Sequence, residues 1–199
     1  DETTGSTATD SSTGGNNGTL SNMENGDWVA GQIGNGLSFD GTNESMIVSA
    51  GTGVLNASQN VTLSTWVYPR SLGAYQGYIY KGVGGCSEAS ASYMLENNSY
   101  PVFWMGGSSL AAGDSTLVAN QWQHLVATNS AGGSAIYLNG VLIKSGAALP
   151  APSTSSEDWS FNYCNRSDAN LDEIRIYNRA LSADEVSQLY RLGTPTSTD

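Results

Sequence analysis

The sequence predicts an all-β fold of many short antiparallel strands, with one short helix near its C-terminal end. Three observations support this prediction. Short alternating stretches are separated by turns rich in Gly, Asn and Asp, and Gly alone provides 24 of the 199 residues. Asn139-Gly140 lies between two such stretches and is a strong hairpin signal. Ser182 and Glu185 have the spacing of a helix capping box.

The expected elements follow one another along a single domain that spans residues 1–193. Residues 1–27 are expected to form loops and turns, and the helix begins after Ser182 and ends before Gly193. The Ser-, Thr- and Pro-rich segment 194–199 is expected to be a separate tail. Alternation predicts two strands within 32–48 and further strands at 61–69, 78–82, 93–96, 101–105, 122–129, 135–138, 141–145, 160–164 and 171–177.

The charge balance excludes several classes of partner. Only 7 basic residues accompany 18 acidic ones, and the formal net charge is −11. Nucleic acid and anionic membrane would therefore be repelled, and strongly anionic polysaccharides are disfavoured as ligands. No apolar run approaches the roughly 20 residues that a membrane-spanning helix needs. This acidic composition is typical of an extracellular or cell-surface protein.

Four segments carry a resemblance to a known family. The specific one is Leu171 to Ser182, and the others are 36–41, 61–69 and 121–128 followed by 137–140. Together they resemble laminin-G-like, concanavalin A-like lectin and glucanase domains of bacterial secreted or surface proteins. The resemblance implies a two-sheet antiparallel jelly-roll sandwich. It implies function less strongly, because function depends on sites rather than folds.

The beginning of the chain departs from the family pattern. In the family, a short strand with an aromatic residue precedes an acidic pair that matches Asp1-Glu2. That opening strand is missing here, so one edge of a sheet is expected to be incomplete. A partner segment, either another copy or an upstream segment, could fill the gap.

The two cysteines, Cys86 and Cys164, are expected to form a disulfide bond. Neither belongs to a C-x-x-C pattern, and an even number of cysteines suits a secreted domain. A redox pair or a set of metal ligands is the alternative interpretation.

No catalytic constellation is expected. Enzymes that resemble this family place paired carboxylates along one strand, where they flank a glycosidic bond. Here Glu96 and Glu173 are isolated, and Glu157-Asp158 lies in a loop. The single His124 lies on an expected strand between apolar residues and is interpreted as a packed residue rather than a base.

The resemblance implies a structural calcium ion. Its ligands would be Asp172 on the closing strand, the Asp40-Gly41 turn and Asp1, since calcium prefers carboxylate and carbonyl oxygens. In the alternative interpretation, Asp172 accepts amide hydrogen bonds and Asp40 only shapes its turn.

Aromatic residues near loops are the candidate sugar-binding residues, because exposed rings often mark recognition sites. Trp66 and Trp122 match framework positions of the family and are expected in the core. The candidate stacking residues are Tyr78, Tyr80, Trp104, Trp159 and Tyr163.

These observations give two functional hypotheses. The first is a non-catalytic, lectin-like carbohydrate-binding or adhesion module, whose partners are glycans or cell-surface polysaccharide. The second is a structural subunit, the globular domain of a pilin-like or other extracellular filament protein. Both place the domain outside the cell.

Overall fold

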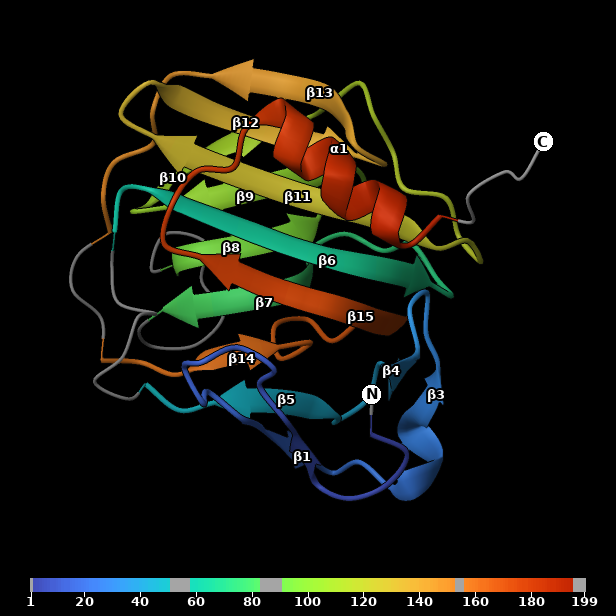
Figure 1. Cartoon of the computed structure of the whole chain (residues 1–199). Helices are drawn as coiled ribbons and strands as arrows, with labels where there is room; N and C mark the ends of the chain where they lie inside the picture. Colours follow the sequence, from blue (N-terminus) through green and yellow to red (C-terminus); the bar gives the residue numbers. More distant parts are fainter. Residues whose placement is uncertain (1, 51–57, 83–90, 153–155, 195–199) are drawn as a thin grey trace.

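The computed structural model describes residues 2–50, 58–82, 91–152 and 156–194. These residues form a sandwich of two antiparallel β-sheets with one α-helix, α1 (Ala183–Leu192), on the outside (Figure 1). The strands are β1 (Thr7–Ala8), β2 (Gly18–Ser21), β3 (Trp28–Ala30), β4 (Asn35–Asp40), β5 (Ser45–Val48), β6 (Val61–Pro69), β7 (Gln76–Gly82), β8 (Ala91–Asn97), β9 (Pro101–Met105), β10 (Ser108–Ala111), β11 (Gln123–Ser130), β12 (Gly133–Leu138), β13 (Val141–Gly146), β14 (Trp159–Phe161) and β15 (Asp168–Tyr177).

The eight-stranded sheet has the order β1-β2-β5-β14-β7-β8-β9-β10, and the seven-stranded sheet has the order β13-β12-β11-β6-β15-β4-β3. All pairings are antiparallel, which confirms the predicted all-β jelly-roll sandwich. Strands distant in sequence meet at the centre of each sheet, as β6 and β15 do. The fold is therefore held by long-range pairing rather than by hairpins alone.

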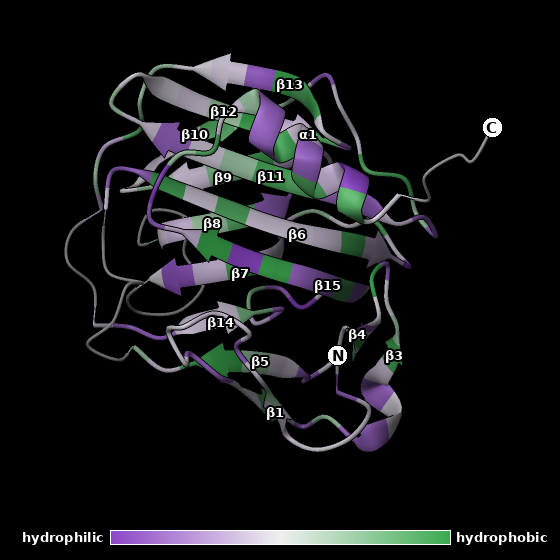
Figure 2. Ribbon diagram, in the orientation of Figure 1, coloured by the Kyte–Doolittle hydropathy of each residue, from purple (hydrophilic) through white to green (hydrophobic). Residues whose placement is uncertain are grey.

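The core fills the space between the sheets. Side chains alternate along each strand, so every second residue faces inward. On β6, Val61, Leu63 and Val67 face the core, as the alternation predicted. Figure 2 shows the hydrophobic and hydrophilic bands that alternate along β15.

The helix α1 covers the outer face of the seven-stranded sheet. Val186 and Leu181 pack against Val126 and Tyr137, and the Tyr190 ring stacks on Trp66 with a centroid distance of 5.5 Å. The capping box is confirmed: Ser182 accepts a hydrogen bond from the Glu185 amide, and the Glu185 carboxylate accepts one from Ser182. Trp66, predicted to be a core residue, is buried between sheet and helix.

Several elements differ from the sequence prediction. The segment 1–27, expected to be loop, contains β1, β2 and the 3₁₀ turn η1 (Asn25–Asp27), and the strands β3 and β10 were not predicted. These strands are two to four residues long, too short to show a clear period. The Asn139-Gly140 turn is confirmed, and both residues have the positive φ that a type I′ turn requires. Of the tail 194–199, only Thr194 lies within the described residues.

In the part of the chain that is described, no helix is long and apolar enough to cross a bilayer.

Candidate functional site

Two of the five predicted stacking residues face the core instead of solvent. Tyr78 and Trp159 are at most 1% exposed and belong to the cluster between the sheets. The Trp159 ring stacks on Tyr93 at 5.2 Å, and Lys81 Nζ lies 5.5 Å from its centroid. Tyr78 was expected on a strand, as a candidate stacking residue, but it lies at a register shift in β7 between Gly77 and Ile79 and faces the core beside Ile79. Neither ring offers a surface for stacking a sugar.

Two other candidates, Tyr80 and Trp104, lie together on the outer face of the eight-stranded sheet. Tyr80 packs with Met94 and Cys164 in one cluster, and Trp104 lies against it. Tyr163 immediately precedes Cys164 and is 43% exposed. Tyr80 is only 4% exposed, so Trp104 and Tyr163 supply the accessible ring surface.

Trp104 is fixed in position by its neighbours. Its Nε1 donates a 2.8 Å hydrogen bond to Oε1 of Glu96, which lies 1% exposed on the adjacent strand β8. Trp104 pairs with Met94 on β8 at one side of β9, and with the exposed Ser109 on β10 at the other side. A partly exposed ring held by a hydrogen bond is preorganised, so it loses little conformational freedom on binding a ligand.

Tyr163 has a charged neighbour. The Arg166 guanidinium lies 5.7 Å from the Tyr163 ring centroid, and Arg166 Nη1 donates a hydrogen bond of 3.0 Å to the Thr42 carbonyl. This contact was not predicted, because the two residues meet through the loop between β14 and β15 rather than along a strand. It places a cation beside an exposed ring.

Cys164 is buried in the same cluster and is not a free thiol. Cys86 lies in 83–90, outside the described residues. The predicted disulfide between the two therefore stays a prediction.

The structure does not bring the predicted calcium ligands together. Asp40 lies opposite Asp168 at one end of the β4–β15 pairing, whereas Asp172 lies just beyond Leu171 at the other end. Four residues of strand separate these positions, or about 13 Å. Asp1 lies outside the described residues, and the described ones contain no cluster of three or more His, Cys, Asp or Glu side chains that could hold a metal. Calcium binding stays a prediction without support from this arrangement.

The alternative interpretation of these aspartates matches the contacts. Asp172 Oδ2 accepts a 2.8 Å hydrogen bond from the Ile33 amide, and Oδ1 accepts one of 2.7 Å from the Glu173 amide. Burial raises the pKa of Asp172, while these amide bonds act in the opposite direction. Asp40 Oδ1 accepts from the Thr42 amide and shapes the turn at Gly41, whose φ is +76°.

His124 is a packed residue, as predicted. It is 2% exposed beneath α1, its Nε2 lies 2.9 Å from Ser64 Oγ, and its ring lies 5.2 Å from that of Trp66. Burial lowers its pKa to about 4, and the charge of Arg175 contributes to the shift. Because α1 covers the Ser64–His124 pair, this pair does not face a substrate.

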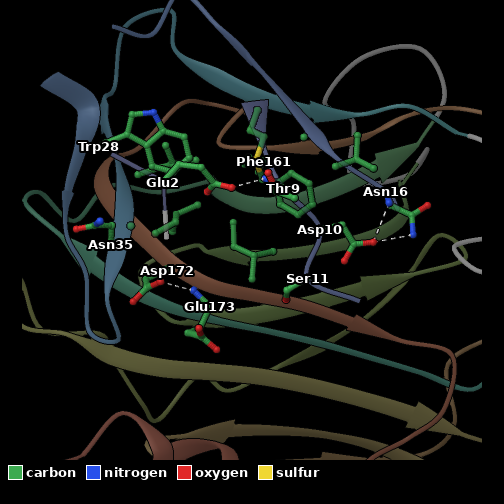
Figure 3. A pocket seen from close by; sticks show the side chains of 18 of the residues that line it. Glu2, Thr9, Asp10, Ser11, Asn16, Trp28, Asn35, Phe161, Asp172 and Glu173 are labelled. Atoms are coloured by element: carbon green, nitrogen blue, oxygen red, sulfur yellow. Dashed lines mark hydrogen bonds between the residues drawn. The ribbon is translucent and has the colours of Figure 1, made fainter. Parts of the chain in front are cut away.

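A cleft that the sequence did not indicate opens between the sheets beside β15 (Figure 3). Its cavity of about 290 Å³ has an apolar floor supplied by both sheets. Glu2, Asp10, Asn35 and Glu173 surround it with polar groups. Hydrogen bonds from Thr9, first that of its side chain and then that of its amide, lower the pKa of Glu2 to about 2, so this side chain is charged at neutral pH.

With the fold and these sites described, the chain can be compared with known proteins. A laminin G-like family model, described as the concanavalin A-like lectin/glucanases superfamily, matches residues 40–187. The chain belongs to this family, as the sequence resemblance implied. No curated protein sequence matches it.

Solved structures share the fold at low sequence identity. Domain 4 of an extracellular arabinanase from Geobacillus stearothermophilus, solved with arabinotriose, is 19% identical with a TM-score of 0.68, and the alignment covers 87% of each chain. The binding domain of botulinum neurotoxin serotype G is 20% identical with a TM-score of 0.69, over 92% of this chain and 48% of that one. The serotype D domain, solved with N-acetylneuraminic acid, is 17% identical with a TM-score of 0.62, over 89% and 46%. The chain thus spans about half the length of these toxin domains.

Proposed function

We propose that this domain is a non-catalytic, lectin-like carbohydrate-binding module of a secreted or cell-surface bacterial protein. The observation that carries the proposal is Trp104, a partly exposed ring held by Glu96 on the outer face of the eight-stranded sheet. Tyr163, next to the cluster residue Cys164 in sequence, adds a second exposed ring. The arabinotriose and N-acetylneuraminic acid complexes of the structural neighbours support a glycan as the ligand.

The chemistry of this face favours neutral glycans. A sugar ring can lay its C–H face on the Trp104 indole, while hydroxyl groups reach polar side chains such as Ser109 on the neighbouring strand. The formal net charge of −11 opposes long acidic polysaccharides. Arg166 beside Tyr163 offers one local cation, so a single acidic sugar residue is compatible with this end of the face.

The test is retention on insoluble polysaccharides, with arabinan and a neutral β-glucan as the first probes. Trp104→Ala and Tyr163→Ala are each expected to weaken binding roughly fivefold, the equivalent of about 1 kcal/mol for one aromatic contact. Trp122→Ala is the matched control. Trp122 was expected in the core, but it is partly exposed and lies immediately before β11, a strand of the other sheet. Equal retention of all four proteins would remove Trp104 and Tyr163 from the site. Release of reducing sugar by the parent protein would contradict the non-catalytic assignment.

The alternative function is a structural subunit of an extracellular filament. One observation is compatible with it: within the described residues, Arg175 to Tyr177 of β15 pair with β6 alone. Lattice-like assembly of the purified domain would select this alternative over glycan binding.

A further inference from the structure

The loop that joins β14 to β15 is held firmly against the neighbouring strand. Asn162 closes the loop, because its Oδ1 accepts hydrogen bonds from the amide of Ser167, at 2.8 Å, and from the hydroxyl group of the same residue. The Gly77 amide donates a 3.0 Å hydrogen bond to the Cys164 carbonyl, which ties the loop to β7. Asn162 and Ser167 are fully buried. The residues between them are therefore preorganised before a ligand binds.

Tyr163 and Arg166 bring an aromatic ring and a cation together on this loop. Tyr163 is 43% exposed, Arg166 is half-buried, and the guanidinium carbon lies over the ring at 5.7 Å from its centroid. Asn165 has a φ of +45°, a left-handed conformation that asparagine adopts more readily than most residues. The turn at Asn165 brings Arg166 back over the Tyr163 ring.

Most of the hydrogen-bonding capacity of Arg166 is unused. A guanidinium carries five N–H donors, and the acceptor here is the Thr42 carbonyl, 3.0 Å from Nη1. Nε is buried without an acceptor, whereas Nη2 is accessible to solvent and has no acceptor among the described residues. A guanidinium fork binds a carboxylate through two parallel hydrogen bonds. Nη2 and the second N–H of Nη1 remain for such a ligand.

The charge of Arg166 is not neutralised by a carboxylate of the described chain. Arg70, Arg175 and Arg179 each form an ion pair with a carboxylate. Arg191, which forms none among the described residues, lies exposed in the last turn of α1, where the helix dipole favours a cation. Arg166 is half-buried on a loop and has no such compensation. A bound anion would offset the cost of burying its charge without a partner.

The ring beside this cation indicates an acidic sugar rather than a free anion. The exposed part of Tyr163 can contact the C–H face of a sugar ring while Arg166 binds a carboxylate on the same sugar. Asp40 lies in the turn that supplies the Thr42 carbonyl, and its charge and the net charge of −11 oppose a chain of many acidic groups. The ligand is therefore expected to present one carboxylate, as the end of a glycan does.

We propose that Tyr163 and Arg166 form a subsite for a single carboxylate-bearing sugar, a uronic acid or a sialic acid at the end of an otherwise neutral glycan. Arg166 binds the carboxylate through Nη1 and Nη2, and Tyr163 supplies the apolar contact. The subsite adds one class of sugar to the proposed carbohydrate-binding function, on which it rests.

The probes are the methyl glycosides of N-acetylneuraminic acid and D-glucuronic acid, each compared with its neutral methyl ester. In NMR titrations of the parent protein, at least one acid is expected to shift the Tyr163 ring and Arg166 side-chain signals, with an affinity about tenfold above that of its ester. The ester keeps the sugar and loses only the charge, and the tighter of the two acids identifies the sugar. No shift with either acid, or equal affinity for acid and ester, would overturn the proposal.

Two variants test the guanidinium fork. Arg166→Gln removes the charge but keeps an amide donor for the Thr42 carbonyl, and it is expected to lower the affinity for the acid to that of the ester. Arg166→Lys keeps the charge but loses the two parallel bonds, so its affinity for the acid is expected to lie between those of the parent and Arg166→Gln. Equal affinity of the parent and Arg166→Gln for the acid would contradict the assignment of Arg166.

A capped Gly-Glu-Gly peptide separates a sugar site from a general carboxylate site. It presents one carboxylate without a sugar ring for Tyr163, so it is expected to bind no better than the ester. Affinity equal to that of the acidic sugar would replace the sugar with an acidic peptide and overturn the proposal. If the acids fail while the parent protein is still retained on neutral β-glucan, only this subsite is lost. Failure of both would remove the carbohydrate-binding function itself.

Discussion

On the outer face of the seven-stranded sheet, aromatic rings are covered by the chain's own helix. Trp66 is 3% exposed, and it contacts His124 and Tyr190. On the outer face of the eight-stranded sheet, Trp104 keeps part of its ring accessible. The two faces carry similar residue types, and what lies over them decides whether a ring stabilises the fold or is available to a ligand.

The largest effect that separates the two faces should come from Trp66→Ala. Removing this buried ring leaves a cavity beneath α1, and the free energy of unfolding should fall by about 3–5 kcal/mol. Trp104→Ala should cost about 1 kcal/mol, because part of its ring is already in water. Urea denaturation of both variants measures the difference. Equal losses would mean that Trp104 is as much a packing residue as Trp66.

The second-largest effect should be a dependence of stability on pH, and it should arise from His124 on the face that α1 covers. The pKa of His124 is about 4 in the folded protein, against about 6.5 when unfolded, so between these values the unfolded chain binds more protons. Stability should therefore fall as the pH drops from about 6.5 to 4, by a total of order 3 kcal/mol, with no further contribution below that range.

His124→Gln is the matched variant, because an amide can still bond to Ser64 but does not titrate. The difference between parent and variant in chemical unfolding at pH 7 and pH 4 isolates the histidine from the carboxylates. If both proteins lose the same stability, His124 does not carry this dependence.

The smallest effect should come from the first turn of α1. Ser182→Ala removes the hydroxyl that accepts the Glu185 amide, and should cost about 1 kcal/mol. Ser187→Ala, in the middle of the same helix, should be neutral or slightly stabilising, because Ala has the higher helix propensity. Thermal unfolding compares the two, and a loss at Ser187 that matches the loss at Ser182 would count against a capping effect.

The parts of the fold that could be predicted from sequence are those set by local chemistry. The Asn139-Gly140 hairpin follows from the positive φ that these two residues readily adopt. The capping box of Ser182 and Glu185 depends only on the first turn of the helix. The two breaks in alternation could not be predicted. Tyr78 in β7 and Glu173 in β15 sit at register shifts, which depend on what the neighbouring strand does.

The candidate site was harder to predict than the fold. The alternating pattern placed Tyr80 and Trp104 on strands. It could not show that the helix would cover the outer face of the other sheet and leave theirs uncovered. Trp159 was expected near the surface because loops surround it in sequence, yet β14 places it between β5 and β7 in the middle of a sheet. The cleft beside β15 has no local signal, because its walls come from residues distributed over most of the chain.

The position of β15 and α1 at the end of the sequence has a consequence for how the protein is made. β6 leaves the ribosome long before β15, its principal neighbour, and the aromatic face around Trp66 stays uncovered until α1 follows. Pairings of such high sequence separation slow folding, and incompletely paired strands invite aggregation. Newly synthesised chains therefore keep an apolar sheet face and the edge of β6 exposed until almost the whole domain has emerged, which is the interval in which a chaperone would bind them.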